Sequence, residues 1–172
     1  MFQEKNQGLS SHAGINGLCH IELWTAYNED GTRYREHGRF ARRLKEERII
    51  HNTVTELGDA HVADQMSDSG DAQLGYMSVG TGNGQVAADV GLDTVLDRNA
   101  LDSTTQGAAG DDNDVIFVCT WVAGDGTGAI TEAGIFLGDD NTSMNYYADF
   151  AVVNKLAPDS LVITWTVTYG AS

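Results

Sequence analysis

Hydrophobic and polar residues alternate over much of the second half of the chain. In residues 161–169, the large apolar side chains at odd positions share one face, and the threonines share the other. Residues 74–79, 129–137 and 144–153 give further short strand patterns, and residues 115–122 are apolar on both faces, like a central strand. The polar stretch 80–113 has room for one or two short strands. Turns rich in glycine and aspartate separate these runs, which indicates antiparallel pairing.

The first half of the chain predicts a hairpin and one helix. Strands are expected near 18–28 and 32–37, on either side of a turn that ends in Asp30 and Gly31. Thr53 and Glu56 have capping-box spacing at the start of a helical pattern, so we expect an α-helix near 52–66. Gly58 costs this helix about 1 kcal/mol relative to alanine, which implies that packing stabilises it. The expected fold is mainly β, an antiparallel β-sandwich or jelly-roll-like fold with this one helix.

Charge divides the chain into two parts. The 172 residues carry a formal charge of −15. Residues 1–48 hold eight of the ten basic side chains, whereas residues 49–172 hold only Arg98 and Lys155 against eighteen acids. We expect residues 1–48 to be an N-terminal arm and hairpin that docks on a partner, and residues 49–172 to be an acidic sandwich with a leading helix. Screening by concentrated salt would relieve the repulsion within that acidic surface, which favours a halophilic protein; the alternatives are an ordinary acidic protein and a calcium-dependent one.

Basic residues gather just before the expected helix. A docking surface for an acidic partner would use the cations of residues 39–48, while the alternative is a solvated strand or helix face. These cations are Arg39, Arg42, Arg43, Lys45 and Arg48. The acidic part of the chain does not suit nucleic acid, because phosphate recognition needs basic groups. No run of eighteen apolar residues occurs and the N-terminus shows no secretory signal, so we expect no membrane insertion.

Arrangements of residues that carry catalysis do not stand out. The glycine-rich run 80–84 follows a strand but lacks the third glycine of a dinucleotide loop and the lysine of a nucleotide loop, so a turn is expected. The five histidines have no zinc-site spacing, and no nucleophile elbow occurs. We therefore expect no enzymatic activity.

Two acidic loops offer oxygen ligands for a hard cation. One contains Asp111, Asp112 and Asp114, and the other contains Asp139 and Asp140. Neither has the spacing of an EF-hand loop. We expect no cofactor here, with structural calcium or magnesium as the alternative. Cys19 and Cys119 lie in apolar runs, and the sequence leaves open whether they are buried thiols or a disulfide.

Four segments resemble, in the same order, a pattern of small structural proteins of tailed virus particles. They are the start of the expected helix from residue 52, the "VGTG" run at 79–82, the "AITEAGIF" run at 129–136, and the "DSLVITWTVT" run at 159–168. The resemblance covers residues 50–170 and implies a head-surface or tail-fibre component. The acidity of the chain indicates a virus of halophilic archaea. Glu132, within the third segment, is expected to accept hydrogen bonds from neighbouring backbone groups and not to act in catalysis.

The resemblance implies a non-enzymatic protein on the virion surface, made in the host cytoplasm and associated with the capsid as a decoration or turret protein. Its expected partners are further copies of itself in a cyclic homo-oligomer and other virion proteins, such as capsid or tail proteins. The alternative is a tail-fibre or baseplate component that binds a host receptor or glycan. In that case Tyr146 and Tyr147 are the expected contact residues.

Overall fold

The structure is a computed structural model that describes residues 14–67, 70 and 72–170. These residues form twelve strands and one helix, in the order β1 (Asn16–Thr25), β2 (Arg35–Glu36), β3 (Arg39–Phe40), β4 (Arg43–His51), β5 (Thr53–Val54), α1 (Glu56–Ser67), β6 (Tyr76–Gly80), β7 (Val95–Ala100), β8 (Ser103–Gln106), β9 (Asp114–Trp121), β10 (Gly128–Phe136), β11 (Met144–Lys155) and β12 (Ser160–Thr168). Within the same residues, no helix has the length and apolar character that spanning a membrane requires.

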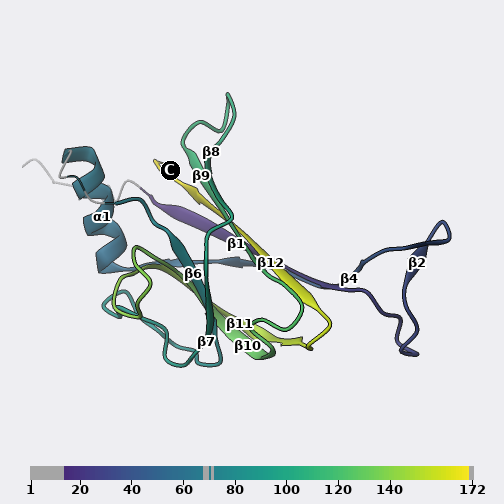
Figure 1. The fold of residues 1–172 in the computed structure, drawn as a ribbon. Helices are drawn as coiled ribbons and strands as arrows, with labels where there is room; N and C mark the ends of the chain where they lie inside the picture. The colour runs from purple at the N-terminus through teal and green to yellow at the C-terminus, as the bar shows by residue number, and fades with distance from the viewer. Residues whose placement is uncertain (1–13, 68–69, 71, 171–172) are drawn as a thin grey trace, which may run out of the picture.

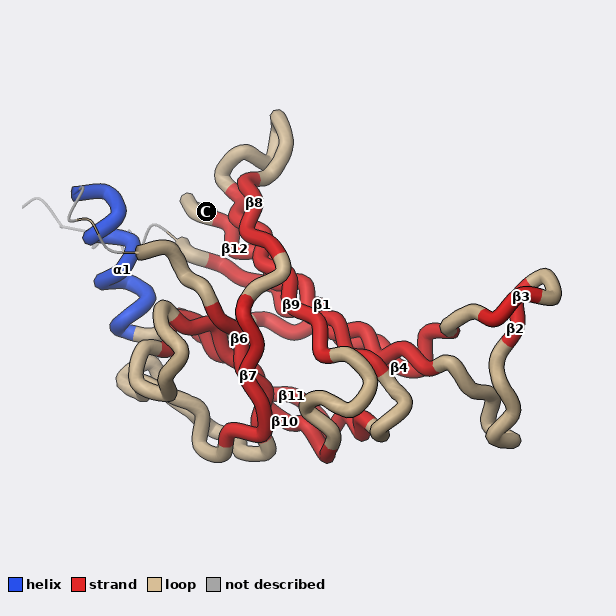
Figure 2. The backbone as a smooth tube through the Cα atoms, viewed as in Figure 1, coloured by secondary structure: helices blue, strands red, loops and turns tan. Residues whose placement is uncertain are grey.

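Two five-stranded sheets form the body of the protein (Figure 1). Sheet I has the strand order β4-β1-β12-β9-β8, and sheet II has the order β5-β11-β10-β6-β7. All of their strand pairs are antiparallel. β2 and β3 form a separate hairpin that projects from one end (Figure 2). The prediction of a mainly β antiparallel sandwich with one helix is confirmed.

β12 lies at the centre of sheet I, and its alternating pattern explains the core. The side chains of Leu161, Ile163, Trp165 and Val167 are fully buried between the sheets. Each contributes about 1.5–3 kcal/mol through burial of apolar surface. The strands expected at 74–79, 115–122, 129–137, 144–153 and 161–169 correspond to β6, β9, β10, β11 and β12, and the polar stretch 80–113 contains β7 and β8.

The helix begins later than its sequence signal predicts. Thr55, and not Thr53, caps α1: the Thr55 hydroxyl accepts a hydrogen bond from the Gly58 amide at 3.0 Å and donates one to the Met144 carbonyl at 2.7 Å. Thr53 instead belongs to β5, because it pairs with β11. A Cβ at Gly58 would lie 2.3 Å from the Asn145 carbonyl oxygen. The glycine thus allows the close helix–strand contact that was expected to stabilise the helix.

The predicted boundary at residue 48 is wrong. It falls inside β4, and β1 lies between β4 and β12 in sheet I. The β1 side chains Cys19, Ile21 and Leu23 are fully buried in the core. Deletion of residues 1–48 would therefore remove part of the sandwich, and not merely a docking segment. Residues 1–13, the start of the expected arm, lie outside the described residues.

The two cysteines are both buried and free. β12 separates them, since Cys19 pairs with Trp165 and Cys119 pairs with Ile163. Two strand spacings alone separate their Cα atoms by roughly 9–10 Å, and the offset of two residues along β12 adds to this distance. The separation is therefore beyond the limit of about 7 Å for the Cα atoms of a disulfide. Cys19 and Cys119 are therefore buried thiols and do not form a disulfide.

Candidate interaction surface

A buried carboxylate joins two of the segments on which the resemblance depends. Glu132, in β10, is completely buried and accepts hydrogen bonds from the backbone amides of Gly82 at 2.8 Å, Thr94 at 3.1 Å and Asp93 at 3.3 Å. This confirms the expected structural role of Glu132. A Cβ at Gly80 would lie 2.4 Å from its Oε1 atom, and one at Gly82 would lie 2.7 Å from it. The glycines of the "VGTG" run therefore leave room for the glutamate of the "ITEAG" run.

Residues 81–94 cover the outer face of sheet II. The Thr131 hydroxyl donates to the Gly82 carbonyl at 2.7 Å, and the Asn141 side chain bonds both the amide and the carbonyl of Leu92 at 3.0 and 2.9 Å. Leu92 packs in a second small cluster with Phe136, Met144 and Tyr147. The glycine-rich run 80–84 thus begins a structural loop, as expected of a turn.

The two tyrosines expected at a receptor contact are both buried, which makes that prediction wrong. Tyr146 is 1 % exposed and Tyr147 is 2 % exposed. Tyr146 packs in the core between the sheets, where its hydroxyl lies 2.8 Å from that of Tyr169. Tyr147 points to the opposite face of β11 and packs beneath residues 81–94. Burial raises the pKa of Tyr147 to about 12.

The most prominent projection is the arm, defined here as residues 26–42, which connects β1 to β4 (Figure 1). At its base the Tyr34 amide donates to the Ala26 carbonyl at 2.8 Å, and Tyr27 and Arg33 form an isolated β-bridge. At its tip β2 and β3 are joined by two residues with positive φ, His37 at 48° and Gly38 at 77°. This is the backbone of a type I′ turn, whose twist suits a two-residue hairpin. The expected strand at 32–37 is thereby reduced to the two residues of β2.

Arginines stack on aromatic rings along the arm. The guanidinium carbon of Arg35 lies 4.0 Å from the centroid of the Phe40 ring, and that of Arg33 lies 5.2 Å from the same ring. Arg33 also lies 5.3 Å from the centroid of Tyr27. The Arg35 guanidinium also donates to the Gly38 carbonyl at 3.1 Å. A guanidinium over an aromatic ring can still bind carboxylates through its remaining N–H groups. Phe40 itself is 59 % exposed, so the tip presents an aromatic ring among cations.

The predicted docking cations divide into one at the tip of the arm and four at its base or along β4. Arg39 is exposed in β3. Arg42 donates to the Ser160 hydroxyl at 3.0 Å, and Arg43 donates to the Tyr27 carbonyl at 3.0 Å. Lys45 pairs with Asp159 at 2.7 Å, and Arg48 pairs with Glu46. The last four side chains thus have partners within the chain, which corrects the prediction that all five form a free docking surface.

Arg33, Arg35 and Phe40 belong to the exposed tip but were not predicted as site residues. The sequence signal was the pair of arginines at alternate positions after the Asp30–Gly31 turn. Residues 33–40 contain three arginines and one glutamate. The arm therefore ends in a basic tip on an otherwise acidic protein.

A network of buried charges fixes the sheet next to the base of the arm. Lys155 is 1 % exposed, and its ammonium group donates to the carbonyls of Val122 at 3.0 Å and Asp159 at 2.8 Å. Burial lowers the pKa of Lys155. Burial on its own would raise the pKa of Asp159, but hydrogen bonds from Lys45, Thr25 and the Leu156 amide hold it below its ordinary value.

The acidic loops do not assemble a cluster of carboxylates. Among the described residues, one group of three or more histidine, cysteine, aspartate or glutamate side chains has ligand atoms within 4.8 Å of one another, and it includes neither loop. Asp140 accepts hydrogen bonds from the Thr142 amide at 2.7 Å and the Thr142 hydroxyl at 2.8 Å, which lower its pKa. Asp139 lies 3.9 Å from Arg98. Asp111, Asp112 and Asp114 lie at the turn between β8 and β9, where the Asp112 carbonyl accepts a hydrogen bond from Gln106 at 2.6 Å.

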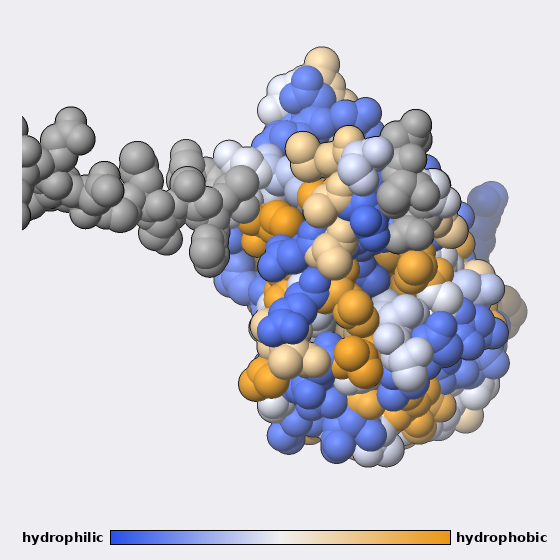
Figure 3. Space-filling view, turned by 90° about the vertical axis from the view of Figure 1, so that its left-hand side faces the viewer, coloured by the Kyte–Doolittle hydropathy of each residue, from blue (hydrophilic) through white to orange (hydrophobic). Residues whose placement is uncertain are grey.

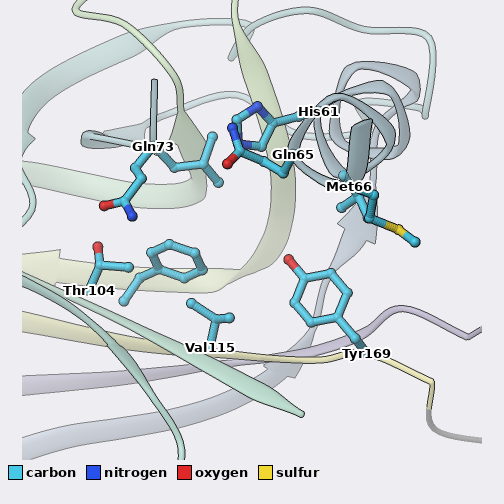
Figure 4. Close-up of a pocket in the computed structure, with 10 residues that line it drawn as sticks. His61, Gln65, Met66, Gln73, Thr104, Val115 and Tyr169 are labelled. Atoms are coloured by element: carbon cyan, nitrogen blue, oxygen red, sulfur yellow. The ribbon is translucent and has the colours of Figure 1, made fainter. Parts of the chain in front are cut away.

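A hollow of about 320 Å³ lies between α1 and the end of sheet I (Figure 4). Its lining is largely apolar, including Val115 and Phe117, with His61, Gln73, Thr104 and Tyr169 at its edges. Hydrophobic and hydrophilic residues are interspersed over this end of the molecule (Figure 3). The arm tip therefore remains the feature with the clearest binding chemistry.

Comparisons with known proteins gave no match: no family model, no curated protein and no solved structure shows significant similarity to the chain.

Proposed function

We propose that the chain is a non-enzymatic structural protein on the surface of a tailed virus particle, associated with the capsid as a decoration or turret protein. The observation that carries the proposal is the basic arm tip on an acidic sandwich. Arg33, Arg35 and Arg39 project beyond β1 and β4, whereas residues 49–172 carry eighteen acids against two basic residues. Because the arm tip is basic and the sandwich is acidic, a partner with an acidic surface attracts the tip and repels the sandwich. This charge arrangement favours one orientation of the chain on its partner over non-specific association.

The four resembling segments support the same proposal. Two of them, at 79–82 and 129–136, meet in the structure through Glu132, Gly80 and Gly82. Their joint occurrence therefore has a physical basis, since the carboxylate needs the glycines and the loop needs the carboxylate.

The proposed partners are an acidic surface of a capsid or tail protein and further copies of the chain in a cyclic oligomer. Exposed guanidinium groups bind carboxylates in a bidentate manner, and the stacked rings hold Arg33 and Arg35 in place before binding. The acidic sandwich would then face a concentrated salt solution. A tail-fibre role has less support, because Tyr146 and Tyr147 are buried.

The location is tested by antibody-gold electron microscopy of purified particles of the virus that encodes the chain. Label over the head, grouped at vertices or faces, is the expected result. Label at the tail end would overturn the capsid assignment in favour of the fibre alternative, and particles without label would overturn the virion assignment itself.

The docking role is tested with an arm variant that leaves the sandwich intact. We expect the triple variant Arg33→Gln, Arg35→Gln, Arg39→Gln to fold but to be absent from particles. The control variant Asp111→Asn, Asp112→Asn changes charge on the β8–β9 turn and should be incorporated normally. Normal incorporation of the arginine variant would show that the arm does not dock.

A further inference from the structure

Three side chains with metal-binding chemistry meet on the outer face of sheet I. His20 and Glu22 alternate along β1, and Glu47 lies directly opposite Glu22 on β4. The His20 Nε2 atom lies 2.7 Å from Glu47 Oε1, and one ligand atom from each of the three residues lies within 4.8 Å of the others. The side chains of His20 and Glu47 are 34 % and 50 % exposed, so ions in solution reach them.

The placement of the two glutamates is unfavourable without a cation. Like charges directly opposite one another on neighbouring antiparallel strands destabilise a sheet. The Glu22 side chain makes no hydrogen bond or ion pair within the part of the chain that the structure describes, and the His20 ring hydrogen-bonds to Glu47. The strong negative charge of the chain also raises the local concentration of cations.

We propose that His20, Glu22 and Glu47 bind one divalent transition-metal ion of the Zn²⁺ class, with water at the fourth position. An imidazole nitrogen and two carboxylate oxygens suit zinc, whereas calcium and magnesium prefer oxygen ligands alone. This cation class differs from the one expected at the aspartate loops. The inference does not depend on the proposed viral function, because the isolated chain is sufficient to test it.

The geometry requires only side-chain adjustment. Metal–ligand distances of about 2.0–2.2 Å in a tetrahedral site place ligand atoms roughly 3.3 Å apart. The pair from His20 and Glu47, now at 2.7 Å, would separate slightly, and Glu22 would move inward from its position within 4.8 Å. Rotation of the exposed Glu47 side chain and of the half-buried Glu22 side chain supplies such shifts. The backbone positions are fixed by the β1–β4 ladder, with Glu22 paired to Glu47.

A bound ion would join β1 to the edge strand β4 outside the core. An ion that binds only the folded state raises the free energy of unfolding in proportion to the logarithm of its concentration above Kd. Zinc should therefore raise the unfolding midpoint of the chain. The effect should require all three ligands.

The test is a titration of the full chain, freed of metal by chelation, with Zn²⁺ in a calorimeter and with Co²⁺ monitored by visible absorption. We expect one Zn²⁺ per chain. Loss of groups that merely orient ligands lowers metal affinity about 10–100-fold, so His20→Ala, Glu22→Gln and Glu47→Gln should each lower it by at least about 100-fold. His51→Ala is the matched control, because His51 is exposed on the same face but pairs with Leu18 at the far end of β4; its affinity should be unchanged.

Two further measurements distinguish a loss of metal binding from a loss of folding. Circular dichroism should match between wild type and the Glu22→Gln variant, and the metal-free unfolding midpoint of the variant should be slightly higher, because the substitution removes the repulsion between Glu22 and Glu47. Zn²⁺ should raise the midpoint of the wild type and leave that of the variant unchanged. Absence of saturable binding by the wild type, or an equal loss of affinity in His51→Ala, would overturn the site and leave an ordinary surface ion pair between His20 and Glu47.

Discussion

Replacement of Glu132 by glutamine should destabilise the protein by about 2–4 kcal/mol. The glutamine oxygen can still accept hydrogen bonds from Gly82 and Thr94, but both lose their ionic character, and the new NH₂ group faces the Asp93 amide. Hydrogen bonds to charged groups contribute about 1.5–3 kcal/mol, against roughly 1 kcal/mol for neutral ones. Glu132→Ala should cost more, about 3–5 kcal/mol, because it leaves one buried and two partly buried amides without an acceptor. Since a domain of this size has about 5–15 kcal/mol of stability, the alanine variant should be close to unfolding at room temperature.

Urea unfolding followed by tryptophan fluorescence measures the global effect of these substitutions. Hydrogen exchange at the amides of Gly82, Asp93 and Thr94 measures the local one, and their protection should fall. Glu29→Gln is the matched control, since Glu29 is exposed and makes the same change of charge; it should alter stability by less than about 0.5 kcal/mol. A Glu132→Gln variant that matched this control in both measurements would refute the reasoning.

Three other predictions follow from burial and charge. Cys19 and Cys119 should react with a thiol reagent only on unfolding, because both are buried and burial raises their pKa, to about 12 for Cys119; rapid labelling of the native protein would contradict this. Since the folded-state pKa of Asp159 is below its unfolded value of about 3.9, the stability from this group is present above about pH 4 and is lost as the pH falls further; acid unfolding curves should therefore be shallower for Asp159→Asn than for wild type. Molar KCl should raise the unfolding midpoint by screening the charge of −15, and a midpoint unaffected by salt would count against the halophilic interpretation.

The sequence predicted elements best where a single strand pattern decides the structure. β12 was recognisable because its buried side chains alternate strictly. The start of α1 was missed because Thr53 and Val54 pair with β11, a contact that no local pattern encodes. Tertiary pairing therefore outweighed the capping signal.

Site residues were harder to predict, because burial depends on segments distant in the chain. Tyr147 looked exposed on an alternating strand, but residues 81–94 cover that face of sheet II. Arg42 and Lys45 looked like free cations, but β12 and the turn before it bring Ser160 and Asp159 to them. The structural role of Glu132 was correctly predicted, although its backbone partners also lie on distant segments.

The attachment of the arm has a mechanical consequence. The arm extends beyond β1 and β4 roughly along their length (Figure 1), and β1 is held by β12 on one side and β4 on the other. The hydrogen bonds between antiparallel strands are perpendicular to the strands. A pulling force on the arm would therefore act in shear on the whole β1–β12 ladder, from Asn16 to Trp24, so that its bonds resist together and do not open one after another. A tether built in this way resists tension through the middle of a sheet.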